Sequence, residues 1–183
     1  MPPLLPFAHL GGMKMNKTLI VFLAPSGLGK TTCGEYLKKT YSAEIIKLAT
    51  PLYEIQKDIY KKVGLSIHSQ DGELLQFLGH KIQTIKPSYL FDEFYKKYQF
   101  SKSELIINDD CRPHNYEYLQ KLGAVFIKIS GPNRDRPDDV SHHLSTHPVE
   151  WQQMIPYDYE IHNTEDLPFL YEQLDNLMRI ICG

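Results

Sequence analysis

The sequence has few cysteines, no long apolar segment and no excess of either charge. Three cysteines, Cys33, Cys111 and Cys182, are scattered along 183 residues, so we expect neither a disulfide framework nor a cysteine metal site. An intracellular, reducing compartment is the simplest interpretation. No stretch approaches the ~20 apolar residues of a membrane span. The formal net charge of −2 argues against a dedicated nucleic-acid or membrane surface, although a small anionic ligand needs only a local basic pocket.

Residues 1–16 (MPPLLPFAHLGGMKMN) differ in composition from the rest of the chain. Proline and glycine interrupt any periodicity there, and neither the basic region nor the apolar core of a signal peptide is present. We therefore expect a flexible leader over 1–16, either a tag remnant or an upstream extension. Residues 17–183 are expected to form one domain, since a chain of this length supports one substantial core.

A glycine-rich loop, Ala24–Thr32, follows the apolar run Leu19–Leu23 and precedes a segment with helical spacing. Strand, glycine loop and helix in this order predict a P-loop, in which backbone N–H groups and the helix N-terminus surround phosphate oxygens. Lys30 would reach the β- and γ-phosphates of ATP, and the Thr31 hydroxyl would ligate Mg²⁺. Ala24 stands where the strict motif has glycine and is small enough to fit. The candidate nucleotide-binding residues are Ser26, Gly27, Leu28, Gly29, Lys30, Thr31 and Thr32.

Apolar periodicity predicts alternating strands and helices. Strands are expected over 19–23, 44–48, 104–110, 125–129 and 157–162, and helices over 31–39, 51–63, 73–85, 89–98, 115–122, 149–155 and 167–181. Thr50 is a candidate N-cap, with Pro51 at the first helical position. This alternation predicts an α/β fold with a five-stranded, mainly parallel sheet and helices on both faces.

Two aspartates, Asp109 and Asp110, close the apolar strand 104–110. In a parallel sheet this places carboxylates at the same edge as the P-loop, where one of them can hold a Mg²⁺-bound water or meet the substrate. The alternative is a turn and helix cap, and the sequence does not decide which aspartate is the working one. Arg112 follows and suits a bidentate phosphate contact.

The polar stretch 130–148 is crowded with turn-forming residues and carries Arg134 and Arg136. Its place after a strand of the predicted sheet favours a lid that brings positive charge to a transferred phosphoryl group. A solvated loop with balanced charges is the alternative. His142, His143 and His147 lack the regular spacing of a zinc site, and contact between His142 or His143 and a substrate phosphate is slightly favoured over zinc binding.

Several short motifs then carry a resemblance to a known family. They are Ser26–Thr32, Ala49–Leu52, Glu73–Gly79 (ELLQFLG), Asp110–Asn115 (DCRPHN) and Tyr157–Thr164 (YDYEIHNT). In this order the chain resembles the P-loop nucleoside monophosphate kinases, closest to the deoxynucleoside monophosphate kinases of bacteriophages, with dephospho-coenzyme A kinases as more distant relatives. The resemblance runs from Leu19 to Ile181.

The resemblance implies roles for individual residues. Lys30 and Thr31 would hold ATP·Mg²⁺, with Asn163 near the adenine. Asp110 would lie between donor and acceptor and share the metal with Thr31, and Arg112 would contact phosphate. The acceptor would bind to the helices within about 50–100, and the lid arginines would be Arg134 and Arg136. The residues assigned to acceptor binding are Thr50, Pro51, Gln76, Asp109, Arg112 and His142.

The chain departs from the family pattern in two places, both on the acceptor side. Gln83 and Thr84 stand where relatives often have an arginine, and Tyr116 stands where they often have a glutamate. The resulting hypothesis is a cytoplasmic kinase that uses ATP and Mg²⁺ to phosphorylate a (deoxy)nucleoside 5′-monophosphate. A homodimer is compatible with this hypothesis. The alternatives are another acceptor (dephospho-coenzyme A, a small alcohol or a modified DNA base) and a non-catalytic nucleotide-binding module.

Overall fold

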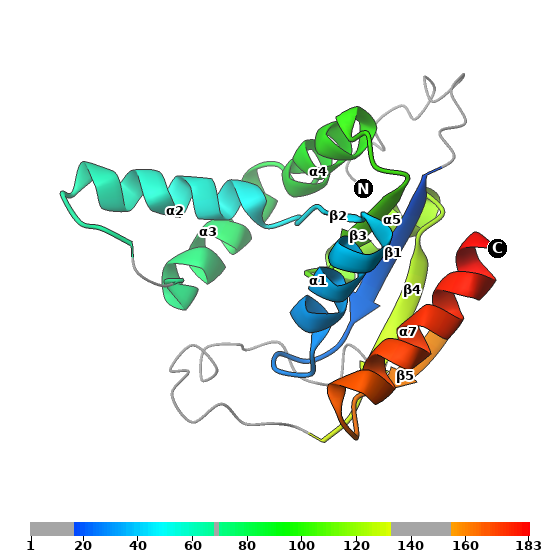
Figure 1. The fold of residues 1–183 in the computed structure, drawn as a ribbon. Coiled ribbons are helices and arrows are strands. Elements are labelled where there is room, and N and C mark those ends of the chain that lie inside the picture. Colours follow the sequence, from blue (N-terminus) through cyan, green and yellow to red (C-terminus); the bar gives the residue numbers. More distant parts are fainter. Residues whose placement is uncertain (1–16, 68–69, 133–154) are drawn as a thin grey trace.

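A computed structural model describes residues 17–67, 70–132 and 155–183. The strands are β1 (Thr18–Leu23), β2 (Glu44–Ile45), β3 (Leu105–Asn108), β4 (Val125–Ser130) and β5 (Tyr159–His162). The helices are α1 (Lys30–Tyr41), α2 (Thr50–Lys62), α3 (Gly72–Ile85), α4 (Tyr89–Phe100), α5 (Pro113–Lys121) and α7 (Leu167–Cys182). The strands form one sheet in the order β2-β3-β1-β4-β5 (Figure 1), and all of the described pairings are parallel. The predicted α/β fold is confirmed.

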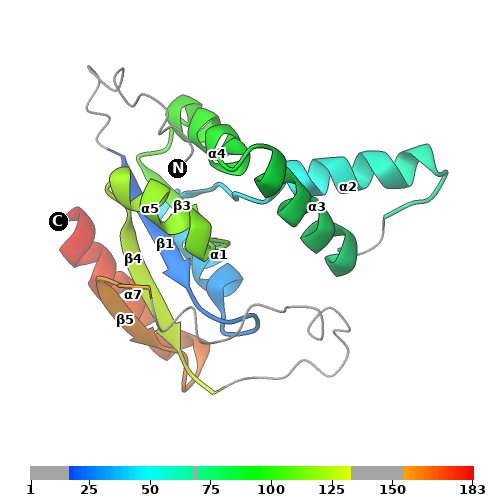
Figure 2. The same cartoon turned by 180° about the vertical axis from the view of Figure 1, so that it is seen from behind.

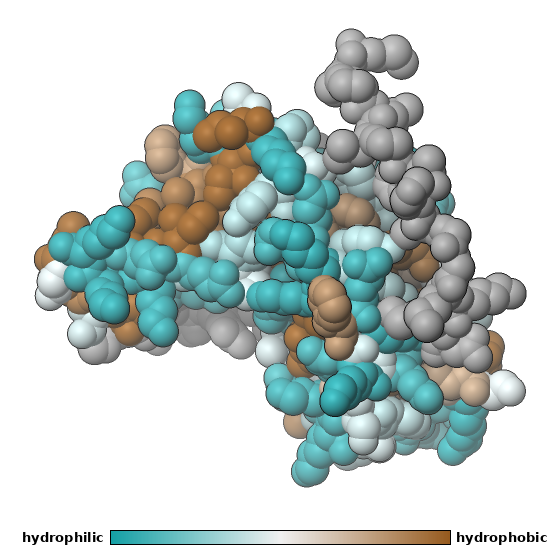
Figure 3. Space-filling view, turned by 90° about the horizontal axis from the view of Figure 1, so that it is seen from above, coloured by the Kyte–Doolittle hydropathy of each residue, from teal (hydrophilic) through white to brown (hydrophobic). Residues whose placement is uncertain are grey.

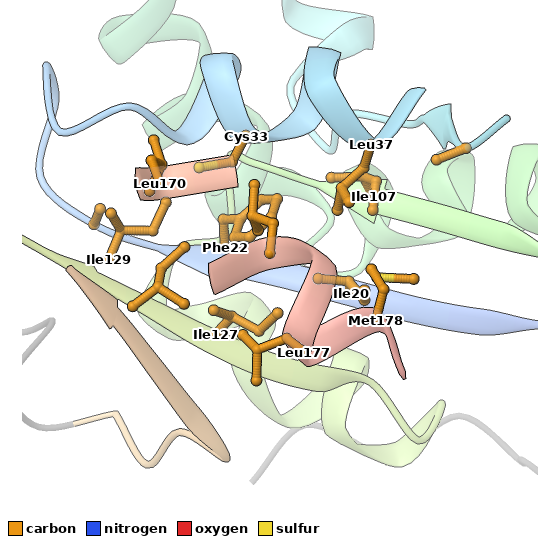
Figure 4. Close-up of a cluster of buried hydrophobic side chains, with 14 of the residues drawn as sticks. Ile20, Phe22, Cys33, Leu37, Ile107, Ile127, Ile129, Leu170, Leu177 and Met178 are labelled. Carbon is orange, nitrogen blue, oxygen red and sulfur yellow. The ribbon is translucent and has the colours of Figure 1, made fainter. Parts of the chain in front are cut away.

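The central strand β1 is buried on both faces of the sheet. Its residues Leu19–Leu23 are at most 1% exposed, as expected of a continuous apolar strand in a parallel sheet. On one face α1 and α7 cover the sheet, and side chains from both helices interlock with β1 and β4 (Figure 4). On the other face α4 and α5 pack against it (Figure 2). All five strands therefore direct their carboxyl ends to one edge, where the loop after β1 lies.

Strand β2 is shorter than predicted, and the shortening has a physical cause. Ile46 N–H still donates to the Ile107 carbonyl at 2.9 Å. The next backbone donors, Leu48 N–H and Ala49 N–H, turn instead to the Asp110 carboxylate at 2.9 and 2.8 Å. The carboxylate thus draws the chain away from the sheet and toward the start of α2.

The predicted N-cap at Thr50 is wrong. Ala49 occupies that position without a side-chain cap, because the Thr50 hydroxyl donates to the Lys47 carbonyl at 2.9 Å instead. Pro51, predicted at the first helical position, is therefore the second residue of α2, still within its first turn, and it is buried.

Helices α2 and α3 extend from the side of the sheet (Figure 1), and we call this pair the helical lobe. None of the residues of α3 is buried, although the helix is amphipathic. Hydrophobic side chains gather on this part of the surface (Figure 3), with Val63, Leu65, Phe77 and Ile85 between 61% and 72% exposed. Within the described ranges, no helix is both long and apolar enough to span a bilayer.

Candidate functional site

The loop between β1 and α1 has the backbone of a phosphate-binding loop. Gly27 and Gly29 have φ angles of 84° and 96°, which residues with a Cβ rarely adopt. The Lys30 ammonium donates to the carbonyls of Ala24 and Pro25 at 2.6 and 2.9 Å. These contacts hold the charged end of Lys30 over the loop, at the N-terminus of α1, where the helix dipole also favours an anion.

Asn163, at the end of β5, supports this loop from the opposite side. Its side-chain amide donates to the Leu28 carbonyl at 3.1 Å, and its backbone N–H donates to the Ser130 carbonyl at 2.7 Å. A Cβ on Gly29 would come within 2.9 Å of the Asn163 amide nitrogen. Gly29 is therefore required both for its φ angle and for this close approach. Asn163 thus lies against the glycine loop, and its place near the adenine of ATP stays a prediction.

Asp109, which follows β3, faces the start of α1. Its side chain is 2% exposed, and Oδ2 accepts from the Thr31 hydroxyl at 3.4 Å and from the Lys47 ammonium at 3.0 Å. Its Oδ1 is buried and has no hydrogen-bond partner among the described residues. A carboxylate beside a threonine hydroxyl is the oxygen-rich donor set that Mg²⁺ prefers, so these residues fit the metal that a P-loop implies.

Asp110 has a different environment, and here the geometry departs from the expectation that Asp110 shares the metal with Thr31. Oδ1 accepts from Leu48 N–H and from the Asn108 side-chain amide, at 2.9 and 2.7 Å, and Oδ2 accepts from Ala49 N–H at 2.8 Å. Burial raises the pKa of Asp110, while the three donors oppose that shift. Its oxygens are thus engaged in joining β3 to the start of α2, and Asp109 is the carboxylate that contacts Thr31.

Several charged groups influence one another at this edge. The pKa of Lys30 is lowered to about 8, chiefly by burial and also by the positive charges of Arg112 and Lys47, while Asp109 and Asp110 oppose the shift. Burial also lowers the pKa of Lys47, but its bond to Asp109 outweighs this effect and raises the pKa overall. Lys30, Lys47 and Arg112 therefore form a group of three cations, which we call the cation cluster. A bound phosphate would relieve the repulsion within it.

The residues expected on the acceptor side are only partly brought together. Arg112 is exposed and precedes α5 in extended conformation. Thr50 and Pro51 lie at the start of α2, beside the Asp110 contact, with the proline buried. Gln76 lies on the exposed side of α3. Arg134, Arg136 and His142 lie outside the described residues, as do all residues of the expected lid from 133 to 148.

Sequence reasoning missed two residues of the site, Lys47 and Asn108. Asn108 is fully buried at the end of β3, and its side-chain amide bridges the Ile46 carbonyl and Asp110 at 3.0 and 2.7 Å. Lys47 directly follows the strand β2 and its continuation at Ile46. A polar residue where a parallel strand ends is the signal that could have identified both, because strand ends meet at one edge.

Comparison with known proteins places the fold. No family model matches the chain, and no curated protein matches its sequence. Among solved structures, TT1252 from Thermus thermophilus superposes with a TM-score of 0.58 and 13% identity, over 91% of this chain and 99% of that one. Shikimate kinase from Acinetobacter baumannii, in complex with shikimate, superposes with a TM-score of 0.52 and 14% identity, over 91% of this chain and 93% of that one.

The strand order, the glycine loop and these similarities together show that the chain has the fold of a P-loop kinase. Identities this low bear on the fold alone.

Proposed function

We propose that this protein is a phosphotransferase that moves the γ-phosphoryl group of ATP to a (deoxy)nucleoside 5′-monophosphate. The observation that carries the proposal is the cation cluster beside the glycine loop: Lys30 lies over the loop, Lys47 contacts Asp109, and Arg112 follows the two aspartates at the start of α5. A P-loop needs one lysine for the donor phosphates. Two more cations at the same edge supply charge for a second anionic substrate, and a nucleoside monophosphate is one.

In this proposal each residue has a definite task. The glycine loop and Lys30 bind the β- and γ-phosphates, and Arg112 contacts the acceptor phosphate, so that two mutually repelling anions are aligned. Bound Mg²⁺ would neutralise charge between the β- and γ-phosphates, with Thr31 and Asp109 as the residues that hold it. Asp110 keeps Leu48 and Ala49 fixed, and through them the start of α2. The proposal also gives tasks to three residues of the expected lid. Arg134 and Arg136 bring positive charge to the transferred phosphoryl group, and His142 contacts the substrate phosphate.

The motifs quoted above favour a nucleoside monophosphate, with the bacteriophage deoxynucleoside monophosphate kinases as the model. The departures at Gln83, Thr84 and Tyr116 fall on the acceptor side, so the acceptor is the part to test first. The structural neighbour that binds shikimate gives one alternative of a different kind, a hydroxyl on a small carboxylate. Dephospho-coenzyme A is another.

The decisive experiment is ADP release from ATP·Mg²⁺, measured with each ribo- and deoxyribonucleoside monophosphate in turn, and then with shikimate and dephospho-coenzyme A. We expect at least one monophosphate to stimulate ADP release strongly. Stimulation by shikimate or dephospho-coenzyme A alone would replace the acceptor and keep the phosphotransferase. Slow hydrolysis that no acceptor stimulates would instead indicate a non-catalytic nucleotide-binding module.

A further inference from the structure

The ion pair between Lys47 and Asp109 stands at the position that a divalent cation requires. Thr31 and Lys47 both donate to the same oxygen of Asp109, Oδ2, at 3.4 and 3.0 Å. A metal held jointly by the Thr31 hydroxyl and Asp109 approaches the carboxylate on the side of Oδ2, the oxygen that Thr31 already contacts. The ammonium is therefore already where the metal would bind.

The burial of Asp109 explains why a cation is needed there at all times. The side chain is 2% exposed, and its other oxygen has no partner among the described residues. A buried carboxylate without a counter-ion is strongly destabilising. Lys47 supplies that counter-ion from the segment after β2.

The two cations compete for this oxygen. An ammonium and a divalent ion within contact distance of one atom repel each other strongly in a partly desolvated site. The Lys47 ammonium is able to move away from Asp109, because the side chain is 36% exposed and has four rotatable bonds. The metal has no equivalent alternative, since Thr31 is fixed at the start of α1.

We propose that Lys47 is the resident counter-ion of Asp109 and that a divalent cation displaces it when the site is loaded. The inference rests on the proposed function for the reason a metal enters the site, but the ion exchange itself requires no acceptor. Lys47 thereby sets how tightly the metal binds, because every binding event has to break the Lys47–Asp109 pair.

The test is Mn²⁺ binding to the nucleotide-free protein at pH 8, followed by electron paramagnetic resonance of the free ion. Lys47→Met removes the competing ammonium, and we expect Mn²⁺ to bind roughly tenfold or more tightly than to the wild type. Arg112→Gln is the matched control, because it removes one positive charge that also acts on Lys30, and among the described residues Arg112 forms no hydrogen bond or ion pair with Asp109. We expect at most about a twofold gain for this variant.

A second measurement guards against a variant that is simply less stable. Lys47→Met should lower the unfolding temperature, and millimolar Mn²⁺ should restore it, because metal binding to the native state stabilises it. Adding Asp109→Asn to Lys47→Met should remove both the tighter binding and the rescue. Equal gains for Lys47→Met and Arg112→Gln, or no gain for Lys47→Met, would overturn the inference. Failure of the proposed function would appear separately, as absence of acceptor-dependent ADP release.

Discussion

The edge of the sheet at the glycine loop and the helical lobe of α2 and α3 are built in opposite ways. At the edge, side chains from four separated segments meet in specific contacts: Lys30 with its loop, Lys47 with Asp109, Asp110 with Leu48 and Ala49, and Asn163 with Leu28. In the lobe, α3 has no buried residue. Its contacts include the hydrogen bond from Tyr60 to Asp71 at 2.8 Å and the N-cap that Asp71 provides.

The two regions therefore differ in how well they tolerate substitutions. Residues at the edge are constrained by several partners at once, so a change there alters the reaction or the fold. The lobe has few long-range constraints, and substitutions on its surface cost little. Under the proposed function the acceptor binds to the lobe, so substitutions in the lobe are expected to affect the acceptor and to leave the glycine loop unchanged.

The largest effect is expected from Lys30→Ala. Removing the ammonium takes away charge at the phosphates in the transition state, and turnover should fall by a factor on the order of 10²–10³ or more. Because the pKa of Lys30 is lowered by burial, its charge does not contribute to stability, and the circular dichroism spectrum should be unchanged. Lys38→Ala, on the exposed side of the same helix, serves as the control and should retain turnover. Normal turnover in Lys30→Ala would remove the loop from the mechanism.

Next in size is a contrast between the two aspartates. Asp110→Ala leaves the backbone N–H groups of Leu48 and Ala49 without their acceptor and should lower the free energy of unfolding by about 1–3 kcal/mol. Asp109→Asn keeps the shape of the side chain and should instead weaken the dependence of activity on Mg²⁺. Urea unfolding and Mg²⁺ titration of the rate separate the two effects. If Asp109→Asn were the variant that unfolds and Asp110→Ala the one that loses Mg²⁺ dependence, the assignment would be reversed.

A smaller effect is expected from Asn163→Ala, which removes the bond to the Leu28 carbonyl. A single neutral hydrogen bond contributes about 1 kcal/mol, so the KM for ATP should rise roughly fivefold while the KM for the acceptor stays constant. Gln173→Ala is the control, because Gln173 contacts the backbone of the neighbouring His162 and not the loop. An equal rise in both KM values would indicate a general loosening of the domain.

The fold could be predicted from the sequence because its signals are local. Apolar runs for the strands, helical spacing between them, and a glycine loop after the first strand each lie within a few residues. Helix ends followed the same rule: α5 was predicted to stop before Gly123, which has a φ angle of 77°. Local signals of this kind fix the order of elements and hence the parallel sheet.

The distinction between Asp109 and Asp110 could not be predicted, because it depends on contacts across the sheet. Adjacent residues after a strand point in different directions, and which one meets Thr31 follows from where β3 ends beside β1. Asp110 instead meets residues some sixty positions earlier in the chain. The role of Lys47 also depends on a contact across the sheet, because its partner Asp109 lies at the end of a different strand.

The smallest effect is predicted for the lobe itself. Phe77, on α3, is 66% exposed, so Phe77→Ala should change the free energy of unfolding by no more than about 0.5 kcal/mol. Phe94, on α4, is 1% exposed, and Phe94→Ala should cost about 3–5 kcal/mol. Urea unfolding at two protein concentrations measures both. A loss above about 1 kcal/mol for Phe77→Ala that grows with protein concentration would mean that a second copy of the chain covers α3. The lobe would then be an interface, and the contrast with the edge of the sheet would hold only for the single chain.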